Sequence, residues 1–299
     1  GFAAGVTIPP GYRRPVLMMT TDGVGTKLEL ARLADHWAGV GYDLVAMVVD
    51  DLAAVGARPI GLVDYLAVGA ISPERDAGIV ASIARACMEA HCPLLGGETA
   101  EHPGVMDPER VDLAAAALGV VEQGEELGPN RVEVGDVVIG LSSPHLRSNG
   151  FSLVRSVVSD RRLDDPFPGE DSSLAEVLLR PSVIYSPAIA QVPRQLLKAG
   201  AHITGGGLPG NLPRMLPAGL GAEIEGKAWT VPSVFRVIQQ WGKIAAAEMT
   251  AVFNLGIGFC LIAGPRQAEE VMAAAGHDAT VIGKVVPGSG VTWRRHPLE

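Results

Sequence analysis

The stretch Thr20-Thr21-Asp22-Gly23-Val24-Gly25-Thr26-Lys27 decides how the first half of this chain is interpreted. It follows the apolar run 16–19, which is typical of a strand, and precedes 28–31, which predicts the start of a helix. The two glycines allow the backbone to approach a ligand closely. A lysine and exposed backbone N–H groups suit phosphate, and the carboxylate of Asp22 suits Mg²⁺. Taken alone, the stretch is equally compatible with a turn whose charges are solvated.

The composition of the 299-residue chain is that of a globular protein, with 47% hydrophobic and 19% charged residues. This length allows one large domain or two ordinary ones. A net charge of −9 and an aromatic content of 5% argue against nucleic-acid binding, which relies on a basic field and on stacking side chains. No apolar run approaches the roughly 18 residues of a membrane span, so we expect no membrane partner.

The three cysteines, Cys87, Cys92 and Cys260, form no C-x-x-C pair. We therefore expect core thiols rather than a disulfide framework or a zinc site, and a reducing, cytoplasmic location. The first residues do not have the pattern of a signal peptide. Because they also lack an initiating Met, we expect the chain to begin inside a longer sequence.

A helix is predicted over 44–56, with Asp43 as its N-cap. It is apolar on nearly every side and should be buried, which makes the adjacent carboxylates of Asp50 and Asp51 costly. Neighbours on a helix point about 100° apart. We expect one carboxylate to reach a metal and the other to make local hydrogen bonds. The alternative is a pair of ordinary surface acids.

A second glycine–acid loop spans 96–101. Its Gly97 and Glu98 again combine close backbone approach with a carboxylate. Asp64 lies inside the predicted strand 60–68, which makes it either an edge position or a site residue.

The polar, Gly- and Pro-bearing segment 122–130 predicts a boundary between domains 1–126 and 127–299. Hydrophobic periodicity predicts the remaining elements. The predicted helices are 74–90, 151–158, 174–179, 184–197, 212–216 and 267–275, and the further strands are 94–95, 112–121, 136–141, 259–263, 280–285 and 291–294.

Two glycine-bearing loops stand out in the second half. In 142–150, small hydroxyls, Asn149 and Gly150 precede a predicted helix and suit an anion, while His145 adds an acid/base group. A lone histidine in such a loop is more often structural or solvated than catalytic. In 202–211, three consecutive glycines indicate close contact of the backbone with a ligand or another strand.

Taken together, five stretches resemble the phosphoribosylformylglycinamidine cyclo-ligase family, also called AIR synthetase. They occur in the family's order, and the resemblance covers essentially all of the chain. The stretches are Thr21–Lys27, Asp51-Leu52 with Gly56–Pro59, Gly96–Glu101 with Pro103-Gly104, Ser148–Arg155, and Thr204–Gly207.

The resemblance implies an ATP-dependent enzyme of purine biosynthesis. The family converts formylglycinamidine ribonucleotide and ATP into aminoimidazole ribonucleotide, ADP and phosphate. ATP is thought to activate the formyl oxygen as a phosphate ester, after which a nitrogen attacks, closes the ring and expels phosphate. Such a reaction needs charge neutralisation, which Mg²⁺ and backbone amides supply.

The resemblance also implies an α+β fold of two domains. The N-terminal domain is expected to bind ATP and to contain a mixed sheet with helices that pairs across a homodimer. The C-terminal domain is expected to be α/β sandwich-like and to bind the substrate.

Site residues are carried over from the motifs that match. The implied magnesium ligands are Asp22, Asp51 and Glu98. The implied nucleotide-binding residues are Asp22, Gly23, Gly25, Thr26, Lys27, Gly97 and Glu98. The implied substrate-binding residues are Ser148, Asn149, Thr204, Gly205, Gly206, Gly207 and Asn211, and the catalytic candidates are His145 and Lys27.

The chain departs from the family pattern at several positions. Asp50 stands where members usually have Asn, and two residues separate His145 from Ser148 where many members have none. Gly210 stands where an acid usually precedes Asn211.

Two other classes of function remain open. One is another ATP-using member of the superfamily, such as thiamine-phosphate kinase or selenophosphate synthetase. The other is a non-catalytic nucleotide-binding or maturation protein, against which the joint presence of Asp22, Lys27, Asp51 and Glu98 argues.

Overall fold

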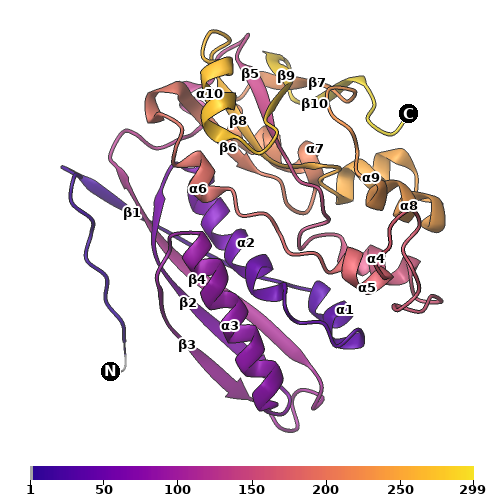
Figure 1. Ribbon diagram of the computed structural model, residues 1–299. Coiled ribbons are helices and arrows are strands. Elements are labelled where there is room, and N and C mark those ends of the chain that lie inside the picture. Colours follow the sequence, from indigo (N-terminus) through magenta and orange to yellow (C-terminus); the bar gives the residue numbers. More distant parts are fainter. Residues whose placement is uncertain (1–2) are drawn as a thin grey trace. The chain divides into compact units, whose positions relative to one another are not determined.

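The computed structural model describes residues 3–299 (Figure 1). Internal contacts divide it into two units, each of which combines segments that are distant in the sequence. Unit 1 contains the residues up to Leu52, Ala57–Gly124 and Phe151–Pro187, and unit 2 contains Ala53–Gly56, Glu125–Gly150 and Ala188–Glu299. The predicted boundary between 126 and 127 stays a prediction, because the contacts return a later segment to unit 1.

Unit 1 is built on a four-stranded mixed sheet in the order β1-β4-β2-β3. β4 runs antiparallel to both β1 and β2, whereas β2 and β3 are parallel. The mixed sheet with helices expected from the sequence is therefore confirmed. The strands are β1 (Pro15–Gly23), β2 (Arg58–Val68), β3 (Leu94–Glu101) and β4 (Val111–Glu122).

Helices cover one face of this sheet, and α2 and α3 cross it side by side in Figure 1. The two helices approach so closely that a Cβ at Gly41 would lie 2.2 Å from the backbone of Ile83. The other face leaves apolar side chains in solvent; Met19, for example, is 76% exposed. The helices of unit 1 are α1 (Lys27–Leu33), α2 (Val40–Ala54), α3 (Pro73–Glu89), α4 (Phe151–Val157) and α5 (Leu174–Leu178), and α6 (Ser186–Ile189) begins there.

An extended segment after α5 is held to α2 by buried polar contacts. Asp43 accepts hydrogen bonds from the backbone N–H and the hydroxyl of Ser182, at 3.0 and 2.6 Å. Asp50 accepts the backbone N–H groups of Tyr185 and Ser186, at 2.8 and 2.9 Å. These bonds explain why a segment that follows the first strand of unit 2 belongs to unit 1.

Unit 2 is built on a six-stranded sheet in the order β10-β7-β9-β5-β8-β6. β10 and β7 pair in parallel, and the other neighbours are antiparallel. The strands are β5 (Val137–Ser142), β6 (Leu197–His202), β7 (Leu220–Glu225), β8 (Ile257–Ala263), β9 (Thr280–Pro287) and β10 (Gly290–Arg295). The helices are α7 (Gly207–Asn211), α8 (Ser233–Gly242), α9 (Ala246–Val252) and α10 (Ala268–Ala275).

Three sequence-based predictions of local structure are wrong. The glycine–acid segment 96–101 is not a loop but the continuation of strand β3, paired along its length with β2. The helix predicted over 184–197 is replaced by the short helix α6, a turn and strand β6, because Pro187 and Pro193 interrupt the helical hydrogen bonds. Asp43 is not an N-cap, since α2 begins three residues earlier at Val40. No helix among residues 3–299 is long and apolar enough to span a bilayer.

Candidate active site

The turn 22–26 lies at the end of β1, where the strand leaves the sheet. Asp22 accepts the backbone N–H of Gly23 at 2.7 Å. Gly25 adopts a φ of +71°, and a Cβ built on it would meet no atom within 4 Å. The backbone here is therefore open enough for the close approach of a ligand.

The structure assigns different environments to the two adjacent aspartates of α2. Asp50 is fully buried and accepts two backbone N–H groups. Asp51 is half-buried and accepts the hydroxyl of Thr20 at 3.2 Å. Thr20 and Asp22 occupy the same face of β1, about 7 Å apart along the strand. Asp51 is therefore held against the strand that carries Asp22, on the same face of the sheet. A magnesium site shared by these two carboxylates stays a prediction.

Glu98 lies away from this carboxylate pair. It pairs with Tyr65, whose side chain is on the exposed face of the sheet, whereas Asp22 is on the helix-covered face. β1 and β3 are the two edges of the sheet, about 14 Å apart. Among residues 3–299, no group of three His, Cys, Asp or Glu side chains could hold one metal ion. The three-carboxylate set predicted from the sequence is thus not gathered within one chain, and a role for Glu98 at the nucleotide stays a prediction.

The absence of a side chain at Gly97 leaves room for the carboxylate of Asp64. Asp64 is buried on the helix-covered face of β2, and a Cβ at Gly97 would lie 2.2 Å from its carboxylate. Burial raises the pKa of Asp64. Asp64 is therefore neither on an edge strand nor on the exposed face.

Lys27 is not presented to solvent. Its side chain is completely buried, with Nζ 2.6 Å from Asp43 Oδ2, and it donates to the carbonyl of Arg180 at 2.9 Å. Burial raises the pKa of Asp43, while Lys27 and Ser182 act in the opposite direction. The buried pair fixes the start of α1 against α2. A phosphate contact by Lys27 stays a prediction.

Thr26 links the first turn to helix α4. Its hydroxyl lies 3.3 Å from that of Ser152. Ser152 lies two residues after Gly150, in the Ser148–Arg155 stretch that resembles the family. Within unit 1, the starts of α1 and α4 are therefore neighbours.

In unit 2, the loop that carries His145 is fixed through its backbone. The carbonyl of His145 accepts from Ser143 Oγ at 3.1 Å and from Asn254 Nδ2 at 3.2 Å. Arg147 is 1% exposed and has a φ of +64°. One guanidinium nitrogen of Arg147 lies 2.8 Å from Nε2 of His202. Because a guanidinium only donates, His202 must accept at Nε2 and carry its proton on Nδ1.

The glycine loop of unit 2 packs against its own chain. Gly207 has a φ of +57°, and a Cβ there would lie 2.2 Å from the carbonyl oxygen of Thr250. The side-chain amide of Asn211 donates to the carbonyls of Gly205 and Gly207, at 3.1 and 2.8 Å. Asn211 thus holds the loop in shape, and a direct substrate contact by this residue stays a prediction.

The open part of the loop is Gly205. A Cβ at Gly205 would lie 3.6 Å from the Asn149 amide nitrogen, so the structure brings these two predicted residues together. Ser148 Oγ is buried and has no hydrogen-bonding partner within residues 3–299. The predicted substrate-binding residues of the two loops are neighbours in unit 2.

The roles of four residues were not predicted from the sequence. Asp43 and Ser182 fix the start of α1 and the segment after α5, and His202 and Asn254 contact the loop that carries His145. Each acts through a partner far away in the sequence, so no local pattern marks it. A charged residue inside an apolar helix was the only available signal, and it was present for Asp43.

Models of the AIR synthase related proteins match both halves of the chain, the N-terminal domain over residues 4–121 and the C-terminal domain over residues 133–294. These two matches and the two-unit α+β fold define the class of protein. The chain is 46% identical to a phosphoribosylformylglycinamidine cyclo-ligase of Thermosynechococcus vestitus over 97% of this chain and 87% of that protein. It is 44% identical to the protein of the same name from Geobacillus kaustophilus, over 95% and 84%. The chain therefore belongs to the phosphoribosylformylglycinamidine cyclo-ligase family.

Solved structures share the fold at lower identity. A thiamine-monophosphate kinase from Stenotrophomonas maltophilia has a TM-score of 0.72 at 19% identity, covering 97% of this chain and 88% of that one. A structure described as AaThiL complexed with AMPPCP and TMP has a TM-score of 0.70 at 16% identity, covering 95% and 85%. The two-domain α+β fold is therefore shared with these proteins.

Proposed function

We propose that this protein catalyses the ATP-dependent closure of the imidazole ring of aminoimidazole ribonucleotide. The substrate is formylglycinamidine ribonucleotide, and the other products are ADP and phosphate. The observation that carries this proposal is the 46% identity to a named cyclo-ligase over 97% of the chain. A cytoplasmic location and a place in purine biosynthesis belong to the same proposal.

ATP and Mg²⁺ are assigned to unit 1. Asp22 and Asp51 would hold the cation, whose charge would offset that of the phosphates and of the transferred phosphoryl group. The turn from Gly23 to Thr26 would present backbone N–H groups to the phosphates. The ATP analogue AMPPCP in a structure of the same fold supports nucleotide binding.

The substrate is assigned to the loops of unit 2. Asn149 and the backbone of Gly205 are neighbours, and the Ser148 hydroxyl offers an unused donor. His145 has its carbonyl fixed by two hydrogen bonds. This anchoring would orient its imidazole for contact with the formyl oxygen or for proton transfer.

The homodimer is proposed through the uncovered face of the unit 1 sheet. Leu17, Met19, Val63 and Tyr65 are between 42% and 76% exposed on that face. An apolar sheet face of this kind is costly in water and is suited to pairing with a second copy.

One assay separates the proposal from its alternative. The full-length protein is given ATP and Mg²⁺ with either formylglycinamidine ribonucleotide or thiamine phosphate, and ADP and the aminoimidazole product are measured. The proposal expects both products with the first substrate and neither with the second. ADP formation with thiamine phosphate alone would replace it with the kinase function.

A further inference from the structure

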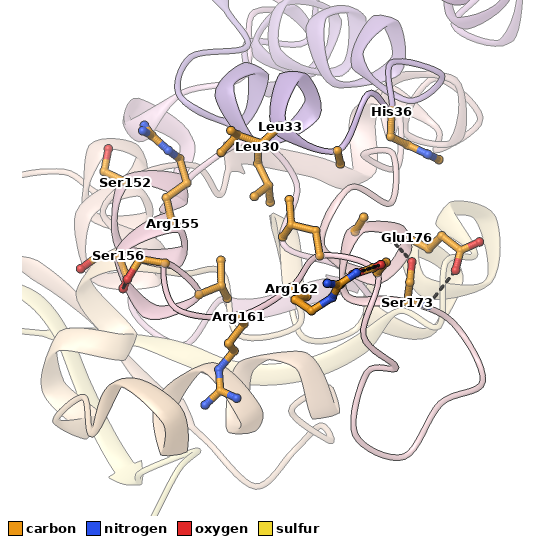
Figure 2. A pocket seen from close by; sticks show the side chains of 16 residues that line it. Leu30, Leu33, His36, Ser152, Arg155, Ser156, Arg161, Arg162, Ser173 and Glu176 are labelled. Atoms are coloured by element: carbon orange, nitrogen blue, oxygen red, sulfur yellow. Dashed lines mark hydrogen bonds and ion pairs between the residues drawn. The ribbon is translucent and has the colours of Figure 1, made fainter.

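Unit 1 contains a pocket of about 1200 Å³ that none of the predicted site residues lines. Its walls are α1, α4, the loop after α4 and the start of α5. Figure 2 shows Leu30 and Leu33 on α1, with Ser152, Arg155 and Ser156 on the neighbouring helix. Small-molecule pockets commonly occupy about 300–1,000 Å³, so this one is large enough for a ligand.

The pocket is locally positive in an acidic protein. Three arginines line it, against one aspartate and one glutamate, while the whole chain carries a net charge of −9. Arg162 is paired with Asp164 at 2.6 Å, but both side chains are largely exposed, so this pair is weak. Figure 2 shows Arg161 pointing away from Leu30 and Leu33. Of the three, Arg155 is the one that lies on α4, the helix that contacts α1.

The guanidinium donors of Arg155 are open to a ligand. It is half-buried, and no hydrogen bond joins it to another group within residues 3–299. Its charge helps to lower the pKa of Glu29, but the hydrogen bonds of that carboxylate come from Arg32 and Arg110. The guanidinium thus retains donors for an anion, and its planar fork suits the oxygens of carboxylate or phosphate.

Serine side chains line the pocket together with Arg155. Ser152 and Ser156 are three residues before and one residue after Arg155, so all three lie on one face of α4. Ser159 lines the same pocket. A phosphomonoester presents three acceptor oxygens, more than a carboxylate, and so matches a guanidinium with several hydroxyls.

The opposite wall is apolar. Leu33 is 55% exposed and lines the pocket with Leu30, which is buried. Val158 and Leu163, which follow α4, add apolar surface to the pocket lining. A ligand that filled the pocket would therefore present a phosphate to α4 and an apolar or ring-bearing part to α1.

We propose that this pocket binds a small phosphomonoester with an apolar or aromatic remainder, at a site separate from the catalytic residues assigned above. Its phosphate contacts Arg155, Ser152 and Ser156, and its remainder packs against Leu30 and Leu33. Because α1 and α4 are joined at their starts by the Thr26–Ser152 contact, such a ligand touches both helices that leave the glycine turns. The proposal does not depend on the cyclo-ligase reaction.

The test is a calorimetric titration of the full chain with AMP as the probe. A non-hydrolysable ATP analogue and Mg²⁺ are present at saturation, so that AMP cannot report the nucleotide site. The expected order of affinity is AMP above both inorganic phosphate and adenosine, because each of these lacks one half of the proposed ligand. Equal affinity of AMP and adenosine would overturn the phosphate assignment.

Variants locate the binding. Arg155→Gln is expected to weaken AMP binding by about tenfold or more, because it removes charge-assisted hydrogen bonds to the phosphate. Leu33→Glu places a negative charge on the opposite wall and is expected to weaken it similarly. Arg85→Gln, an exposed arginine on α3 outside the pocket, is the matched control and should bind AMP as the wild type does.

Folding of each variant is checked by thermal unfolding. Wild-type affinity in both Arg155→Gln and Leu33→Glu, or no AMP binding to the wild type at millimolar concentration, would overturn the proposal. Neither result would bear on ring closure, which is measured separately with the ribonucleotide substrate.

Discussion

Lys27 in unit 1 and Arg147 in unit 2 are both buried cations in stretches that suggested ligand binding. Lys27 is completely buried and forms an ion pair with Asp43, whereas Arg147 is 1% exposed and donates to the neutral imidazole of His202. In both units the cation fixes the turn from within. A cation in a stretch that resembles a ligand-binding motif can therefore stabilise the shape of the loop instead of binding the ligand's charge.

The largest expected effect comes from breaking the ion pair of unit 1. Asp43→Asn leaves the Lys27 ammonium buried without its carboxylate and is expected to lower the free energy of unfolding by about 3–5 kcal/mol. Urea denaturation of the full chain measures this. Asp164→Asn, which breaks an exposed pair with Arg162, is the control and should change stability little. An unchanged midpoint for Asp43→Asn would show that the pair is not needed for the fold.

The corresponding change in unit 2 should be smaller. Arg147→Gln removes one charged hydrogen bond to His202, an expected loss of about 1.5–3 kcal/mol. It also frees the imidazole to exchange tautomers. Nitrogen-15 NMR should find the Nδ1–H form of His202 in the wild type and a mixture in the variant. A mixture already present in the wild type would contradict the assigned contact.

The smallest expected effect is the contribution of Glu29 to the pH dependence of folding stability. The hydrogen bond from Arg32, together with the Arg32 and Arg110 charges, lowers the pKa of Glu29 below its ordinary value of 4.5. A carboxyl with a lowered pKa stabilises the fold above its ordinary pKa, and this contribution is lost as the pH falls through the folded-state value. Between about pH 5 and 3, stability should therefore fall less steeply in Glu29→Gln than in the wild type. Parallel pH profiles would argue against this network.

Much of the fold of unit 1 was predictable from the sequence. The helix predicted over 74–90 is α3 (Pro73–Glu89), and the strands predicted over 60–68 and 112–121 are β2 and β4. These segments have strong periodicity and clear boundaries. Strand β6, Leu-Lys-Ala-Gly-Ala-His, was missed because alanine and lysine favour a helix and only pairing with β8 makes it a strand.

The candidate site was less predictable, for a related reason. Asp51 reaches the strand of Asp22 because α2 packs on β1, where it accepts the hydroxyl of Thr20. Glu98 is on the other face because of the register of β3. Neither relation is visible in local sequence. The roles of Asp50 and Asp51 were distinguishable only once the segment that carries Tyr185 was placed on α2.

The most direct test of the account compares Asp51→Asn with Asp50→Asn. Both variants change the same functional group at adjacent positions of one helix, and ring closure and urea stability are measured for each. We predict that Asp51→Asn loses turnover by orders of magnitude with little change in stability, because its carboxylate serves the cation. Asp50→Asn should lose stability, because its carboxylate holds two buried backbone N–H groups. Full turnover in Asp51→Asn would contradict the assignment of this carboxylate to the active site.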